Sequence, residues 1–168
     1  LKDLLKIDQG GMTFRPVVGA FENVVELDFR SLYPSLMYKY NISGETINCK
    51  CCEKGGIKVP FLPYHTCTKR RGIVGETLAR LLSRRGEIKE KLAEKNLSEE
   101  VRNKLEMQST SIKWCLVTSF GYTGYKNAKY GRREAHEAIT AWGRESILKA
   151  KEISEDNGWE LLHALTDS

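Results

Sequence analysis

A short apolar segment that runs without a spacer into a helix start constrains the fold more than any other stretch of the chain. Residues 24–28 (Val-Val-Glu-Leu-Asp) alternate as a β-strand does, and Pro34 then falls in the first turn of a predicted helix, where proline is tolerated. Asp28 is therefore predicted at a strand end, next to the backbone N–H groups of a helix N-terminus. A carboxylate beside such an anion cradle suits a magnesium–triphosphate complex, although an Asp or Ser that only caps the helix is the commoner meaning of the pattern.

Two amphipathic stretches in the middle of the chain predict a pair of antiparallel helices. Between residues 75 and 94 the apolar side chains fall within an arc of about 120° on a helix. They are Leu78, Leu81, Leu82, Ile88 and Leu92. Arg85 and Lys89 lie within the same arc, where a cation is costly unless it meets an anion or reaches solvent, so we expect both to face whatever the hairpin closes over. Ser98 starts a second stripe after a short turn, with Lys113 at its edge.

The positive charge of the chain is concentrated where this hairpin begins. The 168 residues carry a net charge of +5, and residues 69–91 hold eight Lys or Arg against three Glu. Such a basic stretch suits a polyanionic partner, nucleic acid or a nucleotide, and the alternative is a solvated helix face. With 40% apolar and 29% charged residues, the composition is that of a soluble globular protein.

The ends of the chain and its cysteines indicate what kind of protein it comes from and in which compartment that protein is expected. The sequence begins with Leu1 rather than Met and ends in what resembles an interrupted strand, so we expect it to be a segment of a longer protein. No apolar run approaches the ~20 residues of a membrane span, and the N-terminus lacks the pattern of a signal peptide. Five cysteines without a secretory signal favour a reducing compartment, which predicts a cytoplasmic location.

The last third of the chain predicts one more helix and one more strand. Residues 132–157 have the apolar period of a helix that ends at Asn157-Gly158. Residues 159–168 then alternate as a strand that places His163, Leu165 and Asp167 on one face. The predicted order is therefore strand, helix, helical hairpin, helix and strand.

Several segments resemble, in the same order, the motifs of family-B DNA polymerases. Residues 28–35 (Asp-Phe-Arg-Ser-Leu-Tyr-Pro-Ser) are similar to motif A, D-x-x-S-L-Y-P-S. Residues 113–121 resemble motif B, K-x-x-x-N-S-x-Y-G, and residues 165–168 (Leu-Thr-Asp-Ser) resemble the D-T-D-S of motif C. Residues 8–11 (Asp-Gln-Gly-Gly) resemble the family's Y-x-G-G segment without its Tyr. The resemblance covers essentially the whole chain and is closest to the divergent archaeal branch with degraded catalytic motifs.

The resemblance implies an α+β fold and a division of the chain. An antiparallel palm sheet with flanking helices would be interrupted by a two-helix fingers hairpin, which together make a partial polymerase domain. Residues 1–22 would connect into the palm, and residues 23–68 would form its first part with a cysteine-rich insert. Residues 69–122 would form the fingers hairpin, and residues 123–168 the second part of the palm, ending in motif C.

The resemblance also implies the catalytic and nucleotide-binding residues. Asp28 and Asp167 would bridge two Mg²⁺ or Mn²⁺ ions, which activate the primer 3′-hydroxyl and stabilise the pyrophosphate leaving group. Tyr33 would stack under the sugar and exclude a 2′-hydroxyl, the alternative being an ordinary core tyrosine. The other nucleotide-binding candidates are backbone donors after motif A and cations of the hairpin and motif B: Phe29, Arg30, Ser31, Leu32, Arg85, Lys89 and Lys113.

Three residues that follow motif B are candidates for contact with DNA. Tyr122, Gly124 and Tyr125 would lie near the nascent base pair and the template strand, with simple packing as an equal alternative. The implied partners are primer–template DNA, deoxynucleoside triphosphates and replication or repair proteins, and no membrane.

The sequence departs from the family pattern at two catalytic positions. Leu165 stands where motif C has its first Asp, and Val117-Thr118 stands where motif B has Asn-Ser. Each loss would slow the reaction by about 10²–10³ if the missing group acts in the transition state. We therefore expect a weak or specialised DNA polymerase, lesion-tolerant or favoured by manganese, and no useful activity from this segment alone. The alternative is a catalytically inactive, DNA-binding scaffold, against which the retention of both Asp28 and Asp167 speaks.

Four cysteines gather in the insert between motif A and the hairpin. They are Cys49, Cys51, Cys52 and Cys67, with His65 nearby. The group is consistent with a structural Zn²⁺ site or with free thiols, and a disulfide of the Cys49–Cys67 type is what some thermophilic relatives carry in this region. The fifth cysteine, Cys115, is expected in the core on the apolar face of its helix.

Overall fold

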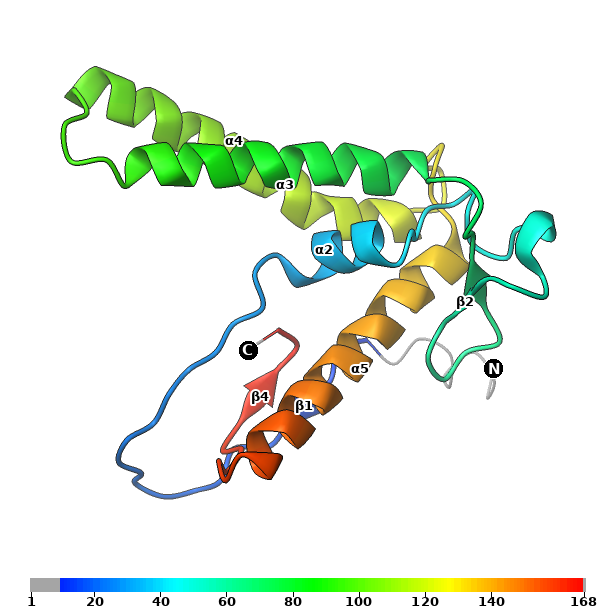
Figure 1. Cartoon of the computed structure of the whole chain (residues 1–168), viewed down its shortest axis with the longest axis horizontal. Helices are drawn as coiled ribbons and strands as arrows, with labels where there is room; N and C mark the ends of the chain where they lie inside the picture. The colour runs from blue at the N-terminus through cyan, green and yellow to red at the C-terminus, as the bar shows by residue number, and fades with distance from the viewer. Residues whose placement is uncertain (1–9, 168) are drawn as a thin grey trace.

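Four α-helices form the frame of the structure, a computed structural model in which residues 10–167 are described. They are α2 (Leu32–Lys39), α3 (Ile73–Leu92), α4 (Glu99–Gly124) and α5 (Arg133–Asp156). α3 and α4 form a long antiparallel hairpin that projects to one side, with α2 beneath its base and α5 running from there toward the C-terminal strand (Figure 1). Helices and small antiparallel sheets together make the α+β architecture that was expected. In residues 10–167 no helix is both long and apolar enough to cross a membrane.

The sheets are short ladders formed by distant or neighbouring segments. β1 (Thr13–Phe14) pairs antiparallel with β4 (Ala164–Leu165), so that the two ends of the described chain lie together. β2 (Ile57–Lys58) pairs antiparallel with β3 (His65–Thr66) in the cysteine-rich insert. Both sheets are two-stranded, and the described residues contain no larger sheet.

The structure corrects the strand predicted at residues 24–28. This segment is extended but forms no ladder, and Val24, Val25 and Leu27 are 61%, 62% and 73% exposed. An alternating pattern gives a strand only where a neighbouring strand accepts its hydrogen bonds, and none lies alongside within residues 10–167. For the same reason the strand predicted over residues 159–168 is reduced to β4, which has a partner in β1.

The core lies where α2, α3, α4 and α5 meet. Met37, Ile42 and Ile139 are fully buried there, each worth roughly 1.5–3 kcal/mol of apolar burial. α3 can cross α2 closely because Gly75 lies against the Met37 carbonyl, where an added Cβ would come within 3.1 Å of the oxygen. Trp142 of α5 completes the core by stacking on Tyr40, with 3.5 Å between the ring centroids and an interplanar angle of 7°.

The helix boundaries confirm the local start and stop signals. Ser98 caps α4 through its side chain, which accepts a hydrogen bond from the Val101 N–H. Gly158, at φ +82°, follows the end of α5 in the left-handed conformation that glycine adopts without strain. α3 and α5 begin and end within two residues of their predicted limits, and α4 begins directly after the predicted Ser98 cap, because the apolar stripe and the caps are local properties of the sequence.

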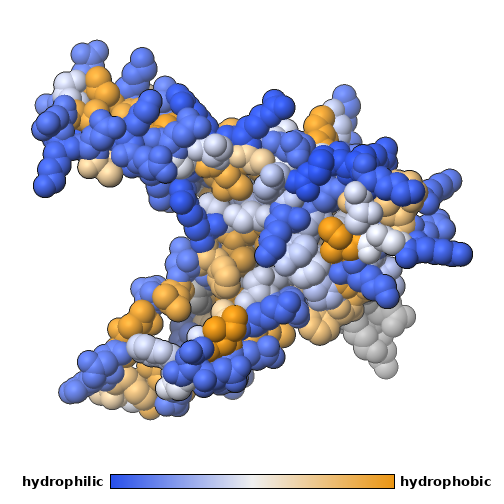
Figure 2. Space-filling view, viewed as in Figure 1, coloured by the Kyte–Doolittle hydropathy of each residue, from blue (hydrophilic) through white to orange (hydrophobic). Residues whose placement is uncertain are grey.

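The projecting hairpin leaves the molecule deeply hollowed on one side. Figure 2 shows this hollow between the hairpin above and the arm below that carries β1, β4 and the chain leading to α2. The outer surface of the hairpin is hydrophilic, while the floor of the hollow shows more apolar and intermediate side chains. α2, which carries the second half of motif A, lies at the inner end of the hollow.

Candidate functional site

The two aspartates predicted as metal ligands come from opposite ends of the chain and are brought together by a backbone hydrogen bond. The Phe29 N–H donates to the Asp167 carbonyl oxygen at 2.8 Å, so Asp28 is one residue away from direct contact with Asp167. Both aspartates are exposed. Carboxylate oxygens are the ligands that Mg²⁺ and Mn²⁺ prefer, and two on adjacent backbones can serve one divalent site.

The turn that carries Asp167 is held by the N-terminal glycines. The Thr166 N–H donates to the Met12 carbonyl at 2.8 Å, and Thr166 itself has a positive φ of 58°. Gly11 packs so closely on this turn that an added Cβ would lie 2.7 Å from Thr166 Oγ1. Arg144 of α5 fixes the preceding Gly10 by donating to its carbonyl oxygen at 2.7 Å. Gly10-Gly11 therefore supports motif C, while residues 8 and 9 of the same segment lie outside the described residues.

The turn between Asp28 and α2 is tight and is not capped by its serine. Ser31 adopts the left-handed conformation, with φ 51° and ψ 54°, and its side chain makes no capping hydrogen bond. Ser35, one turn into α2, instead donates its hydroxyl to the Arg30 carbonyl at 3.1 Å. Since the Phe29 N–H is taken by Asp167, the backbone N–H groups of residues 30–32 are the candidates for binding an anion at this helix start.

Tyr33 is half-buried in a row of rings from three helices. Its ring centroid lies 4.4 Å from that of Phe120 on α4, and Phe120 in turn stacks on His136 of α5 at 4.1 Å. Gly143 of α5 leaves the space for Tyr33, because a Cβ there would come within 3.0 Å of Tyr33 Cε1. Phe120 and Gly143 thus fix the position of the Tyr33 ring at the start of α2.

The three basic side chains predicted to bind the triphosphate have no carboxylate partner within residues 10–167. Lys89 and Lys113 are exposed, and Arg85 is half-buried with its Nε buried and without a hydrogen-bond partner. The neighbouring Arg84 is different, since it pairs with Glu87 at 3.0 Å. A buried donor left unpaired costs about 1–3 kcal/mol, so Arg85 has a reason to bind an added anion.

A pocket of about 410 Å³ joins motif A to the hairpin. It is lined by Arg30 and Ser35 on one side and, from α3, by Leu82, Ser83, Gly86, Glu87 and Glu90. Arg30 reaches α3 at Gly86, where its Nη2 would be 3.5 Å from an added Cβ. Motif A is therefore a neighbour of the face of α3 that carries Gly86, Glu87 and Glu90, and Arg85 does not line this pocket.

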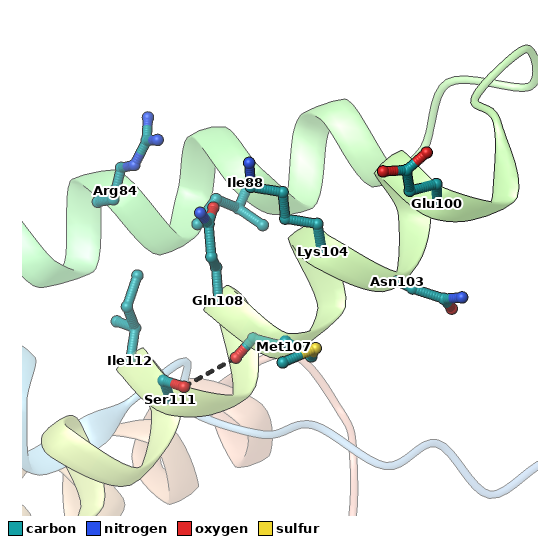
Figure 3. A pocket seen from close by; sticks show the side chains of 9 residues that line it. All are labelled: Arg84, Ile88, Glu100, Asn103, Lys104, Met107, Gln108, Ser111 and Ile112. Carbon is teal, nitrogen blue, oxygen red and sulfur yellow. Dashed lines mark hydrogen bonds between the residues drawn. The ribbon is translucent and has the colours of Figure 1, made fainter.

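A larger pocket of about 590 Å³ lies along the hairpin itself, between α3 and α4 (Figure 3). The side chains around it include Arg84, Ile88, Met107 and Ile112. No predicted catalytic or nucleotide-binding residue lines it, so it is separate from the site around Asp28.

The three DNA-binding candidates lie where α4 ends. Tyr122 and Tyr125 are exposed, and the Tyr122 hydroxyl accepts a hydrogen bond from the Tyr130 N–H at 3.4 Å. Gly124 packs on α5, where an added Cβ would lie 2.9 Å from His136 Nδ1. Close packing against α5 thus explains a glycine at position 124, whereas the two tyrosines present their rings to solvent.

Comparison with known proteins identifies the family of this chain. The sequence model of DNA polymerase family B matches residues 5–168. The chain belongs to DNA polymerase family B. DNA polymerase 2 of Saccharolobus solfataricus is 38% identical over 168 residues, which cover 100% of this chain and 24% of that protein. The DNA polymerase of Pyrococcus glycovorans is 37% identical over 160 residues, which cover 94% of this chain and 20% of that protein.

The fold agrees with the family assignment. The structure of the family B DNA polymerase from Pyrobaculum calidifontis matches with a TM-score of 0.69 and 26% identity, covering 83% of this chain and 19% of that one. The predicted resemblance to family B and to archaeal members is thereby confirmed. This family B chain spans about a fifth to a quarter of the length of the relatives it matches.

The four cysteines of the insert bring their sulfur atoms together in this family B chain. All four Sγ atoms lie within 4.8 Å of one another. Cys51 Sγ is 3.5 Å from Cys49, 3.7 Å from Cys52 and 3.6 Å from Cys67, and Cys52 and Cys67 are 3.6 Å apart. All are free thiols. Such a group can hold one thiophilic metal ion.

The thiols of this cluster differ in acidity. Burial and the neighbouring thiols raise the pKa of Cys49 to about 12. The hydroxyl and backbone N–H of Thr68 lower the pKa of Cys52 to about 6 by hydrogen bonding to the thiolate. His65 is not among the four, because its Nε2 lies 3.0 Å from the Cys49 carbonyl. Cys115 corrects a prediction, since it is exposed on α4 rather than in the core.

Two polar residues matter for the site although the sequence did not single them out. Asn41 follows α2 and donates to the carbonyls of Cys67 and Arg70, at 2.7 and 2.8 Å, while accepting from the Gly72 N–H at 2.8 Å. It thereby fixes the entry into α3. Glu137 of α5 is buried and is bound by Arg133 at 2.9 Å and by the Tyr64 hydroxyl at 2.7 Å. Helical spacing could have suggested the Arg133–Glu137 pair, but the contacts of Asn41 and Tyr64 are long-range.

Proposed function

We propose that this chain forms the palm and fingers part of a template-directed DNA polymerase that adds deoxynucleotides to a primer 3′-hydroxyl. In this assignment residues 69–122 are the fingers hairpin, residues 23–68 and 123–168 are the two parts of the palm, and residues 1–22 lead into it. The observation that carries the proposal is the hydrogen bond from Phe29 to Asp167, which places motif A beside motif C. The family membership supports the same reaction class.

Asp28 and Asp167 would hold the divalent metals of the reaction. Their carboxylates fit Mg²⁺ or Mn²⁺, because they are hard oxygen ligands, exposed, and attached to hydrogen-bonded backbone segments. When bound, a pair of such ions activates the 3′-hydroxyl and stabilises the pyrophosphate leaving group. The Gly11–Thr166 contact would keep Asp167 in position during this step.

The incoming nucleotide would lie at the inner end of the hollow, between motif A and the hairpin. Backbone N–H groups of residues 30–32 would bind phosphate oxygens at the start of α2. Arg85, Lys89 and Lys113 would bind the remaining triphosphate charge, and closing of the hairpin would bring them to it. Tyr33, held by Phe120 and Gly143, would meet the sugar and exclude a 2′-hydroxyl.

Primer–template DNA would enter through the hollow, past the end of α4. Tyr122 and Tyr125 expose aromatic rings there on which bases can stack, and Gly124 lets α4 approach α5. Leu165 in place of a carboxylate and Val117-Thr118 in place of Asn-Ser remove polar groups from the reacting region. We therefore propose an enzyme with a slow chemical step, by about 10²–10³ for each group that acts in the transition state.

Primer extension by the full-length protein tests this proposal. Asp28→Ala and Asp167→Ala should each lower the extension rate at least about 100-fold, because each removes a metal ligand. Asp156→Ala is the matched control, since Asp156 is an exposed aspartate at the end of α5, away from the hydrogen-bonded pair. Equal rates in the wild type and all three variants would contradict the proposal and leave a DNA-binding scaffold.

A further inference from the structure

We propose that Cys49, Cys51, Cys52 and Cys67 bind one structural zinc ion at the base of the hairpin. This site is independent of the polymerase function and lies on the opposite side of the molecule from the C-terminal strand (Figure 1). It holds the insert together and fixes the segment from which α3 begins.

The distances between the sulfur atoms match a single tetrahedral ion. Zinc–thiolate bonds are about 2.3 Å long, so the edges of a tetrahedral site with four sulfurs measure about 3.8 Å. The four separations between Cys51 and its neighbours and between Cys52 and Cys67 are 3.5–3.7 Å. The remaining two pairs also lie within 4.8 Å.

The same distances disfavour a disulfide and an iron–sulfur cluster as alternatives to a single zinc ion. A disulfide joins its sulfurs at about 2.05 Å, and no pair in the cluster is near that value. An iron–sulfur cluster contains several metal atoms, and its outer cysteine sulfurs would stand farther apart than these four. One tetrahedral ion with soft ligands is therefore the arrangement that fits, and zinc is the common metal for it.

The backbone around the cysteines presents the sulfurs and supplies N–H donors to two of them. Cys49 to Cys52 form a tight turn that contains a 3-10 helix over Lys50–Cys52, and Cys67 follows β3 directly. Backbone N–H groups of Thr68, Lys69 and Arg70 hydrogen-bond to the sulfurs of Cys52 and Cys67. Such N–H donors around thiolates orient the ligands and offset their charge, as outer-shell contacts do in metal sites. His65 binds the Cys49 carbonyl and so holds the turn without being a ligand.

The turn that carries the cysteines lies outside the main core, although Ile47, Val59 and Tyr64 anchor the rest of the insert to it. Cys49, Cys52 and Cys67 form a buried group of their own, apart from the main core. The ladder beside them consists of two residues from each strand, which is too little for stability by itself. Small segments without a core of their own are commonly held by a metal or by disulfides.

The position of the site gives it a structural role. Cys67 is joined through its carbonyl to Asn41, and Asn41 also binds Arg70 and Gly72 at the entry into α3. An ion on Cys67 would thus fix the base about which the hairpin can move. Four protein ligands leave no open position on the metal, so the site does not take part in the chemistry.

Metal analysis of the full-length protein, purified with a thiol reductant and without chelator, tests the proposal. The wild type should contain about one zinc ion per chain at this site, and Cys52→Ser and Cys67→Ser should lose most of it. Cys115→Ser is the matched control, since Cys115 is exposed on α4 and outside the cluster. It should keep the zinc of the wild type.

Cobalt and thermal measurements keep the test decisive if a serine variant fails to fold. Reduced, metal-free wild type titrated with Co²⁺ should develop the intense visible bands of tetrahedral thiolate coordination, and Zn²⁺ should displace them. A chelator should lower the melting temperature of the wild type and of Cys115→Ser alike. Absence of these bands in the wild type, iron in place of zinc, or equal zinc loss in Cys115→Ser would overturn the proposal without touching the polymerase assignment.

Discussion

In the proposed polymerase site, Leu165 stands where the resemblance to motif C implies a carboxylate. It lies two positions before Asp167, pairs with Thr13 in the ladder of β1 and β4, and is 52% exposed. An exposed leucine at the end of a short strand contributes little to the core, so a polar residue should be tolerated there. The position is therefore open to a carboxylate on structural grounds.

Leu165→Asp is predicted to raise the rate of primer extension by about tenfold or more in the full-length protein. A second acidic group beside Asp167 would strengthen metal binding, and each tenfold gain requires only about 1.4 kcal/mol of transition-state stabilisation. Single-turnover extension with Mg²⁺ measures the effect. Leu165→Asn has nearly the same shape without the charge, and equal rates for the two variants would exclude a role of the carboxylate.

At the scale of the elements, α3 carries both core residues and a cation that we propose binds an anion. Its apolar residues meet α2 and α4, as the amphipathic stripe predicts, with Leu78 and Ile88 buried. Arg85 lies within that stripe and its Nε has no partner, whereas Arg84 beside it is neutralised by Glu87. Evolution of a helix for stability alone would place an apolar residue at position 85, which is why we assign Arg85 to an anion.

Arg85→Leu is predicted to weaken deoxynucleotide binding about 10- to 100-fold while leaving the stability unchanged or up to about 1 kcal/mol higher. The loss corresponds to a hydrogen bond to a charged group, about 1.5–3 kcal/mol, and the gain to removal of a buried, unpaired donor. Nucleotide titration and thermal melting of the same samples separate the two effects. Arg84→Leu serves as the control, and a similar loss of affinity in it would assign the effect to the general basic charge of α3.

At the scale of the molecule, single contacts connect parts that are distant in the sequence. The insert is tied to α5 by the hydrogen bond from Tyr64 to Glu137, whose other oxygen is bound by Arg133. Burial and the charge of Glu137 raise the pKa of Tyr64 to about 12, compared with an ordinary value of 10.0. The folded state thus prefers the protonated tyrosine, and its stabilisation is complete below about pH 10 and disappears as the pH rises through about 12.

Tyr64→Phe is predicted to lower the free energy of unfolding by about 1–3 kcal/mol at neutral pH, because it leaves one oxygen of the buried Glu137 without a partner. The difference from the wild type should shrink between about pH 10 and pH 12. Urea denaturation across this range measures it. Tyr38→Phe makes the same change on an exposed tyrosine and should have little effect, and a pH-independent difference for Tyr64→Phe would contradict the assigned pKa.

The amino-acid sequence by itself determined the elements that depend on near neighbours. The limits of α3 follow from apolar spacing, the start of α4 from the Ser98 cap and the end of α5 from the stop at Gly158, all within a few residues of the features they define. The order of the motifs was enough to identify family B, which the comparison confirmed.

The tertiary structure alone decided the relations between distant residues. Residues 24–28 have a strand pattern, yet they remain unpaired because a ladder needs a partner that the pattern cannot supply. The approach of Asp167 to Phe29, the contact of Gly11 with Thr166 and the contact of Cys67 with Cys51 join segments that are brought together beside the β1–β4 and β2–β3 ladders. Capping and apolar spacing act over a few residues, whereas these contacts join residues far apart in the sequence, for which closing the intervening loop has an entropic cost that local patterns do not reveal.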